Sequence, residues 1–373
     1  NALRAAISGA LPPEALTSKR MFDVLDLCLE CKACKAECPS NVDMAKLKYE
    51  FMDGYRREHG HTLRSRIFGN IATLSKWGSF FAPVSNWTIQ SGALTGLLEK
   101  EIGIDKRRRL PLFASQTFTQ WFKSRGGSPE SAATRGQVVL FPDTFTNYNH
   151  PNLGIAATRV LERLGYQVIV PGTKCCGRPM LSQGMLSKAR ANASFNVATV
   201  LPYIEQGAML VGLEPSCLLS FRDDYVDLLG GEAGARRVGE SAMLIEEFVL
   251  YARQEADAGL EFENPPGKLL LHGHCHQKAL VGTQPAMDLL RSIPGCDPVE
   301  IPSGCCGMAG AFGLEKEHYD TSIAIGEQVL FPAIREQEGD FVVVSEGVSC
   351  RQQIEHGTGK RAKHLVEVLA DAL

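Results

Sequence analysis

Four cysteines at short, regular spacing stand near the start of the chain. Cys28, Cys31, Cys34 and Cys38 are separated by two, two and three residues, and Pro39 follows them. Three cysteines at three-residue intervals on a tight loop can reach three irons of one [4Fe-4S] cubane, while N–H groups of the loop point at the sulfurs. Zinc is the alternative ion, but zinc sites favour two separated Cys-x-x-Cys pairs. The run therefore predicts an iron–sulfur cluster.

The fourth cysteine of this run has its own consequence. We expect Cys38 to start a helix that leads away, so that it binds a different cluster when two are present. No second copy of the run occurs between Asn1 and Leu373. Either all four cysteines bind one cubane, or a partner run lies before Asn1. Because the chain starts with Asn, inside what reads as a helix, we expect it to be a piece of a longer polypeptide or a processed product.

Two further pairs of cysteines are adjacent in the sequence, Cys175 with Cys176 and Cys305 with Cys306. Adjacent cysteines bond to each other poorly, because a disulfide needs separated Cα atoms. Disulfide frameworks also belong to small secreted domains that lack a core. We interpret the pairs as ligands of metal centres, and we expect a reducing, cytoplasmic location.

The elements that must position these pairs form an internal repeat, since 130 positions separate Cys175 from Cys305. In each copy one strand leads to a polar turn, a second leads to Cys-Cys-Gly, and a third leads to a single cysteine. The predicted strands are 137–141, 166–170 and 209–213, then 268–271, 298–301 and 341–344, with helices such as 153–164 and 185–201 between them. Strands that alternate with helices indicate α/β units with small parallel sheets, whose sites lie at the carboxyl ends of the strands.

The two copies of the repeat differ in their ligands. The second copy has four cysteines, which suffice for a cubane or a tetrahedral zinc ion: Cys275, Cys305, Cys306 and Cys350. In the first copy Thr144 stands where Cys275 is expected, with Asp143 beside it. Three cysteines are left there: Cys175, Cys176 and Cys217. Whether the first copy binds metal stays open.

Other residues near the second pair have less specific interpretations. Cys296 has no counterpart in the first copy, and we expect it to pack as a small hydrophobic residue. His272, His274 and His276 surround Cys275 and are potential metal ligands, but we favour satisfied polar groups.

The stretch from Lys46 to Phe122 is predicted to be helical and has an amphipathic pattern. Arg64, Arg66 and Lys76 alternate with apolar residues: Ile67, Phe68, Ile71, Leu74, Trp77 and Phe80. We expect ordinary core packing of this apolar face, with a quinone-access or membrane-surface helix as the alternative. The basic run 106–109 is expected to be a solvated turn.

The composition excludes several classes of protein. The chain has 373 residues, of which 44% are hydrophobic and 22% charged, and its net charge is −3. This charge gives no general attraction to nucleic acid or to an anionic membrane. No apolar run reaches the roughly 18 residues that a spanning helix needs. No flavin or dinucleotide fingerprint is present, so we expect no substrate oxidation on this segment alone.

These motifs resemble the cysteine-rich CCG domain family, which is found in one subunit of heterodisulfide reductase, in one subunit of anaerobic glycerol-3-phosphate dehydrogenase and in glycolate oxidase iron–sulfur subunits. The resemblance covers 135–373, preceded by the ferredoxin run. Segments 28–48, 141–147 and 214–217 look closest to the C-terminal part of fused FAD-linked oxidases of D-2-hydroxy acids. The heterodisulfide reductases end each repeat with Cys-x-x-Cys, whereas Cys217 and Cys350 are single here. The non-cubane cluster of that enzyme is therefore in doubt.

The resemblance implies an α+β chain with three parts: an all-α ferredoxin-type domain over 1–130, and CCG repeats over 135–260 and 265–373 with small parallel sheets. It implies that the cysteines of the run and of the second repeat bind [4Fe-4S] clusters, with zinc possible at a CCG site. FAD is expected on an upstream domain or partner, and quinone or another carrier as the acceptor, at the inner face of the membrane if the chain contacts lipid. The implied function is an electron-transfer module for D-2-hydroxy acid oxidation. The alternatives are disulfide reduction at Cys305 and Cys306, or structural zinc.

Overall fold

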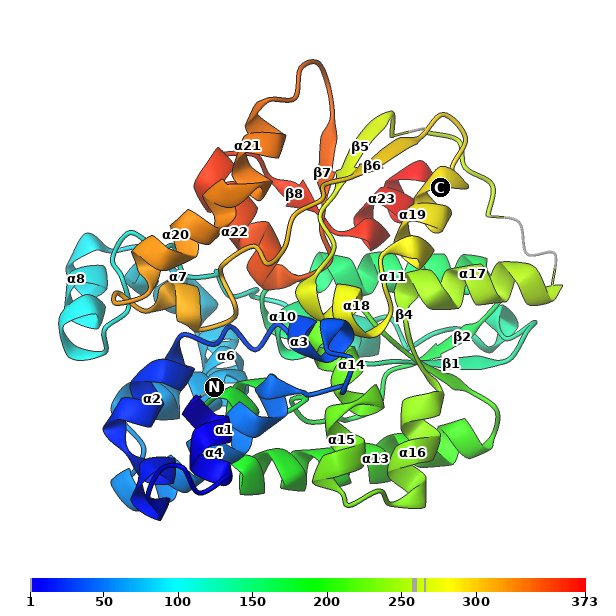
Figure 1. The fold of residues 1–373 in the computed structure, drawn as a ribbon. Helices are drawn as coiled ribbons and strands as arrows, with labels where there is room; N and C mark the ends of the chain where they lie inside the picture. The colour runs from blue at the N-terminus through cyan, green and yellow to red at the C-terminus, as the bar shows by residue number, and fades with distance from the viewer. Residues whose placement is uncertain (1, 257–259, 265) are drawn as a thin grey trace.

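The computed structural model describes residues 2–256, 260–264 and 266–373. The named elements of the described residues before β1 are all helices (blue and cyan in Figure 1). They are α1 (Ala2–Ile7), η1 (Pro13–Thr17), α2 (Lys19–Asp26), α3 (Ala33–Glu37), α4 (Met44–His59), α5 (Leu63–Gly69), α6 (Ile71–Phe80), α7 (Ala82–Ile89), α8 (Gly92–Glu101), α9 (Phe118–Ser124) and η2 (Glu130–Ala132).

The rest of the chain forms two parallel sheets of four strands each. The first has the order β2-β1-β3-β4 and the second β6-β5-β7-β8, so the two copies share one topology. The strands are β1 (Gln137–Leu140), β2 (Gln167–Ile169), β3 (Met209–Gly212), β4 (Ala242–Leu244), β5 (Lys268–Leu271), β6 (Asp297–Glu300), β7 (Val342–Val344) and β8 (Ala362–Lys363). The prediction of an α+β chain with small parallel sheets is confirmed, and the six predicted strands are present. The edge strands β4 and β8 were not predicted.

Helices connect the strands in both copies. The first copy contains α10 (Thr144–Tyr148), α11 (Pro151–Arg163), α12 (Arg178–Ser182), α13 (Leu186–Glu205), α14 (Pro215–Arg222), α15 (Asp224–Leu228), α16 (Ala233–Glu240) and α17 (Ile245–Ala256). The second contains α18 (Cys275–Leu280), α19 (Gln284–Arg291), η3 (Phe312–Leu314), α20 (Tyr319–Gln328), α21 (Leu330–Arg335), α22 (Val348–Thr358) and α23 (Leu365–Ala372). Strands and helices alternate because two parallel strands must be joined by a crossover connection, which is usually a right-handed one through a helix.

One hydrophobic core joins the two copies. Successive side chains of a strand point to opposite faces of its sheet. Val138 and Leu140 of β1 accordingly face one core, while Val139 faces another on the far side of the sheet. Leu269 and Leu271 of β5 belong to the same core as Val138 and Leu140. Helix α11 packs against α23 and α17 against α19 at this shared core, so neither sheet buries its inner face alone.

The helical segment is tied to the second copy by a buried arginine. Arg108 donates hydrogen bonds to the carbonyl of Gly313 at 2.6 Å, to Gln353 Oε1 at 2.7 Å and to Ser322 Oγ at 2.8 Å. The expectation of a solvated turn over 106–109 is therefore wrong for Arg108, because its guanidinium finds three fixed acceptors in the second copy.

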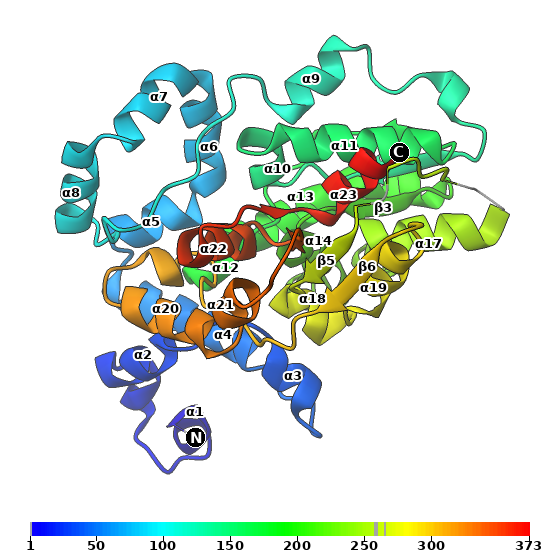
Figure 2. The same cartoon turned by 90° about the horizontal axis from the view of Figure 1, so that it is seen from above.

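Helix α6 has its apolar side chains on the outside. Trp77 is 58% exposed and Phe80 is 72% exposed, whereas Ser75 and Ser79 are buried. The expectation of ordinary core packing is wrong for these two aromatic residues, although it holds for Phe68, which is buried. Figure 2 shows α7 and α8 at one side of the molecule, away from both sheets. None of the helices in the described residues is both long and apolar enough to cross a bilayer.

Candidate metal centres

The run of four cysteines occupies the loop between α2 and α4, with the short helix α3 inside it. Cys34 lies in α3, and Cys38 is the residue that ends this helix, with its N–H bonded to the Cys34 carbonyl. The expectation that Cys38 starts a helix is therefore wrong, since the next helix begins at Met44. All 12 cysteines of the chain are free thiols.

Two residues between the cysteines have a left-handed backbone. Glu30 has φ of 55° and Lys32 has φ of 61°, a conformation that costs a non-glycine residue roughly 1–2 kcal/mol. Both side chains are buried and paired with charges outside the loop. The Glu30 carboxylate lies 3.2 Å from Lys48 Nζ and 3.5 Å from a guanidinium nitrogen of Arg178. These contacts offset the strain and hold the cysteine loop in one conformation.

The four thiols of the loop fall into two environments. Burial raises the pKa of Cys31, and the neighbouring thiols of Cys275 and Cys34 raise it further. Burial likewise raises the pKa of Cys28, which also interacts with Cys31. For Cys38, N–H groups of the turn that follows lower the pKa, and no cysteine in the described residues contributes to the shift. The loop therefore brings Cys28, Cys31 and Cys34 together, whereas the Cys38 thiol lies apart and accepts hydrogen bonds from backbone N–H groups.

The second copy brings four thiols together at the carboxyl ends of its strands. Cys275 starts α18 after β5, the adjacent pair follows β6, and Cys350 lies in the first turn of α22 after β7. Cys275 and Cys305, Cys305 and Cys306, and Cys306 and Cys350 are neighbours whose thiols shift the pKa of each other. The interaction with Cys305, together with burial, raises the pKa of Cys275 well above its usual value.

This donor set fits a metal centre. Cys306 and Cys350 are buried and Cys275 and Cys305 are partly buried, and neighbouring thiols of this kind cannot all ionise unless a cation compensates their charge. A metal centre that binds sulfur supplies that charge, and four thiolates suit either an iron–sulfur cluster or a tetrahedral zinc ion. Backbone donors also face the sulfurs, since the Gly307 N–H lies 3.4 Å from Cys305 Sγ. Such N–H···S bonds stabilise thiolates and tune a bound cluster.

His272 faces the same thiols, although the sequence favoured an ordinary polar role for it. One ring nitrogen of His272, Cys306 Sγ and Cys350 Sγ all lie within 4.8 Å of one another. Its Nδ1 bonds to Ser303 Oγ at 2.7 Å, and its Nε2 has no hydrogen-bond partner among the described residues. Burial lowers the pKa of His272 to about 3, so the ring is neutral. The alternation of three histidines around Cys275 was the only sequence signal for this placement.

The other two histidines make polar contacts, as expected. His274 Nδ1 accepts the N–H of His276 at 3.1 Å and so caps helix α18. His276 Nε2 lies 2.9 Å from the carbonyl oxygen of Glu30 in the cysteine loop. Helix α3 packs against α18 at this point. The loop of the first run and the four-thiol site of the second copy are therefore neighbours.

The first copy gathers three thiols and a hydroxyl. Cys176 Sγ lies 3.0 Å from Cys217 Sγ. The neighbouring thiol of Cys176 raises the pKa of Cys175, and the hydroxyl of Thr144 lowers it. Thr144 starts α10 after β1 just as Cys275 starts α18 after β5, which confirms that the two positions correspond. Cys296 packs partly buried against the shared core, as expected.

Asp143 is the candidate fourth ligand of the first copy, but part of its carboxylate is already bonded to the backbone. One carboxylate oxygen accepts the N–H groups of Phe145 and Thr146 and caps α10, while Oδ2 has no partner among the described residues. Burial and the nearby charge of Glu214 raise the pKa of Asp143 to about 6. This copy therefore offers a weaker ligand set than the second.

Glu214 connects the two copies. It ends the loop after β3, and its Oε2 accepts the N–H of Val348 at 2.8 Å. Val348 is the first residue of α22, the helix that contains Cys350. A carboxylate at a helix N-terminus is stabilised by the helix dipole, so this contact fixes the helix on which Cys350 lies.

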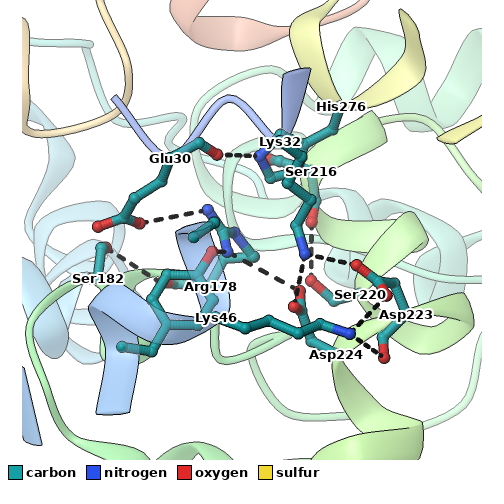
Figure 3. A network of polar contacts seen from close by, with 12 residues as sticks. Glu30, Lys32, Lys46, Arg178, Ser182, Ser216, Ser220, Asp223, Asp224 and His276 are labelled. Carbon is teal, nitrogen blue, oxygen red and sulfur yellow. Dashed lines mark hydrogen bonds and ion pairs between the residues drawn. The ribbon is translucent and has the colours of Figure 1, made fainter. Parts of the chain in front are cut away.

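A buried network of charges fixes the cysteine loop on the first copy, and sequence reasoning missed it (Figure 3). Lys32 Nζ lies 2.5 Å from Asp223 Oδ2 and 2.8 Å from Asp224 Oδ1, and its side chain is fully buried. Lys46 Nζ also bonds to Asp223, at 2.6 Å. Arg178 bonds to the hydroxyl of Tyr49 on α4 and reaches Glu30. Because 191 positions separate Lys32 from Asp223, no local pattern predicts the pair.

A separate cluster of His318, Asp26 and Glu315 links α2 to the second copy. His318 lies 3.3 Å from Asp26 and 2.9 Å from Glu315. Despite burial, hydrogen bonds to the two carboxylates raise the pKa of His318 to about 9. A charged imidazole between two carboxylates satisfies all three groups without a metal ion.

Comparisons with known proteins agree with the repeat. The profile of the cysteine-rich domain family CCG matches residues 139–222 and again 269–355. The chain is 33% identical to a subunit of the anaerobic glycerol-3-phosphate dehydrogenase of Escherichia coli (strain K12), over 84% of this chain and 78% of that protein. It is 27% identical to D-2-hydroxyglutarate dehydrogenase of Pseudomonas putida, over 94% of this chain but 34% of that protein. Lactate utilization protein A of Anoxybacillus flavithermus is 28% identical, over 62% of this chain and 98% of that protein.

Proposed function

The chain belongs to the cysteine-rich CCG domain family, together with the similar subunit of anaerobic glycerol-3-phosphate dehydrogenase, and we propose that it is the iron–sulfur electron-transfer module of an FAD-linked oxidoreductase. In this proposal Cys28, Cys31 and Cys34 bind one [4Fe-4S] cluster, and the four thiols of the second copy bind another centre. Cys38 serves a further cluster, as its separation from the other three suggests. Clusters bound by these thiolates would supply one-electron donor and acceptor chemistry.

The observation that carries the proposal is that the cysteine loop packs beside the four-thiol site, with α3 against α18. Cys275 is close enough to Cys31 to raise the pKa of the Cys31 thiol. The hydrogen bond between His276 and the Glu30 carbonyl holds the cysteine loop beside Cys275. A structural zinc site gains nothing from such a neighbour, whereas electron transfer requires that redox centres lie near each other. The buried network around Lys32 keeps this distance constant.

Positive side chains surround the thiols on the protein side. The charge of Lys48 lowers the pKa of Cys28, although burial is the larger effect and raises it. Lys278 lies close enough to Cys350, Cys275 and Cys305 to interact with their charges. An added electron is stabilised by such cations in a low-dielectric site, so these lysines favour cluster reduction. The buried walls exclude water, which protects the reduced centre.

We propose that a flavin domain or partner chain oxidises a D-2-hydroxy acid of the D-lactate, D-2-hydroxyglutarate or glycolate type. The alignments with D-2-hydroxyglutarate dehydrogenases support this choice, since they reach 94% to 95% of this chain but only 34% to 35% of those proteins. Quinone or another carrier is the proposed acceptor, at the inner face of the membrane. Substrate oxidation itself is assigned to the flavin component.

Burial of the second site disfavours the alternative of disulfide reduction. Cys306 is 3% exposed and Cys350 is 2% exposed, so a bulky disulfide would reach only the partly exposed Cys275 and Cys305. Structural zinc remains an outcome that metal analysis distinguishes.

The test is anaerobic purification with quantitation of iron, acid-labile sulfide and zinc. Cys306→Ser should lose the iron of one cluster, while the matched variant Cys296→Ser, which changes a thiol outside the site, should keep all of it. Electron paramagnetic resonance of the reduced protein should show interaction between two centres. Unchanged iron in Cys306→Ser, or stoichiometric zinc without sulfide, would contradict the proposal.

A further inference from the structure

The helices α6 and α7, with Phe81 between them, expose a set of large apolar side chains. We call this set the aromatic face; its members are between 41% and 75% exposed: Leu74, Trp77, Phe80, Phe81, Val84 and Trp87. The rings of Trp77, Phe80 and Phe81 contact each other, with centroids 4.7–6.4 Å apart. A contiguous exposed patch of this kind marks an interaction site, because single exposed apolar residues are common but clusters are not.

The orientation of these helices is fixed by polar contacts on their inner side. Ser79 is buried and bonds to the carbonyl of Ala114. Asn86 makes two hydrogen bonds to the backbone of Phe113, both at 2.8 Å. A Cβ at Gly78 would lie 2.6 Å from the ring of Phe113, so α6 approaches that segment closely. The small and polar residues therefore face the protein, and the helix cannot rotate to bury its aromatic side chains.

The charges around the aromatic face favour a lipid surface as its occupant. Between Arg66 and Glu99 the sequence contains one charged residue, Lys76, which is exposed. A protein partner that recognises one orientation usually meets charges of both signs at the rim. Helices that lie in the interface of an anionic bilayer typically combine Trp and Phe with Lys and lack acidic residues, and this segment has that composition.

We propose that the aromatic face inserts into the interface of a lipid bilayer and docks the protein on an anionic membrane with α6 and α7 parallel to its plane. This inference deepens the proposed function, since a quinone acceptor is dissolved in lipid, but the binding itself requires no cluster. Figure 2 shows α7 and α8 at one side of the molecule, away from the sheets.

Tryptophan fluorescence tests the proposal, because the chain has 3 Trp residues and two belong to the face. The probe is vesicles of phosphatidylcholine with phosphatidylglycerol, with and without bromine on the acyl chains. The fluorescence of Trp77 and Trp87 should shift to the blue and be quenched by the brominated lipid. Trp121, which packs against the shared core, should not respond. Trp121→Phe should therefore retain the full response.

Substitutions on the exposed surface measure the contribution of the face without disturbing the core. Phe80→Ser should weaken vesicle binding about tenfold, as expected when one Phe no longer enters the lipid. Phe195→Ser, which removes an exposed Phe on α13, should leave binding unchanged. Lys76→Gln should weaken binding about fivefold on anionic vesicles and leave it unchanged on phosphatidylcholine alone.

The measurements are made on the anaerobically purified protein, with iron content determined on each sample. Absence of quenching on any vesicle would overturn the proposal. So would a dimer in sedimentation that Phe80→Ser dissociates while vesicles bind nothing, because the occupant would then be a second copy. Vesicle binding by a sample that lacks iron would support the lipid contact while contradicting the electron-transfer function, so the two failures are distinguishable.

Discussion

Replacement of Lys32 by Met should release the cysteine loop from the first copy. The side chain of Lys32 is fully buried, and its ammonium pairs closely with Asp223 and Asp224 and lies 3.7 Å from a third carboxylate, that of Asp43. Breaking a buried ion pair from one side costs about 3–5 kcal/mol, because the partner charge stays buried without compensation. Asp223 keeps Lys35 at 2.5 Å and Lys46 at 2.6 Å, whereas Asp224 keeps Arg178, at 3.8 Å, as its one cation among the described residues. We therefore expect the free energy of unfolding to fall by about 3 kcal/mol, near the lower end of that range.

The loop should respond more than the rest of the protein, because the left-handed residue at position 32 then loses the ion pairs that offset its strain. Urea unfolding monitored by circular dichroism gives the stability, and hydrogen exchange over residues 28–38 gives the local opening. The iron of the second copy should remain while the iron of the loop decreases. Lys35→Met is the matched control, since that side chain is 22% exposed and its pair with Asp223 is worth about 0–1 kcal/mol. Equal urea midpoints and full iron content in both variants would refute the reasoning.

Three further predictions concern the sites and their surroundings. Gly347→Ala should lower the metal content of the second copy, because its Cβ would lie 2.3 Å from the ring of His274; Gly304→Ala, which meets nothing within 4 Å, should not. Thr144→Cys should add metal to the first copy, measured as extra iron or zinc per chain, with Thr144→Ser unchanged. The raised pKa of His318, about 9, gives stability that is complete below about pH 6.5 and lost as the pH rises to 9. The urea midpoint should fall over that range, equivalent to about 1–3 kcal/mol, and His318→Gln should remove the dependence on pH.

The sequence predicted six strands because each is a short run of β-branched and apolar residues that ends in a turn or a cysteine motif. Strands β4 and β8 were missed for a physical reason. They have three and two residues and include Ala and Lys. They lie at sheet edges, where hydrogen bonds to the neighbouring strand, and not their own sequence, fix the extended backbone. The spacing of the cysteines placed the four thiols of the second copy at the correct strand ends.

Pattern alone could not tell which face of a helix is buried. The amphipathic period of α6 correctly groups Trp77 with Phe80, but the same period fits burial or exposure. Arg108 shows the same limit, since a run of basic residues does not reveal that one of them meets three acceptors in the second copy. The pair of Lys32 and Asp223 depends on tertiary structure and has no local signal.

The interior shared by the two sheets restricts how the duplicated halves can diverge. The half with Thr144 has one cysteine fewer at its strand ends than the other half, yet its strands and α11 still form one wall of the hydrophobic interior on which the other half depends. Deleting it would expose the apolar side of β5 and α23 to water and favour aggregation. Selection on solubility and folding can thus preserve the first half whether or not it binds metal, and its three thiols can change without loss of the scaffold.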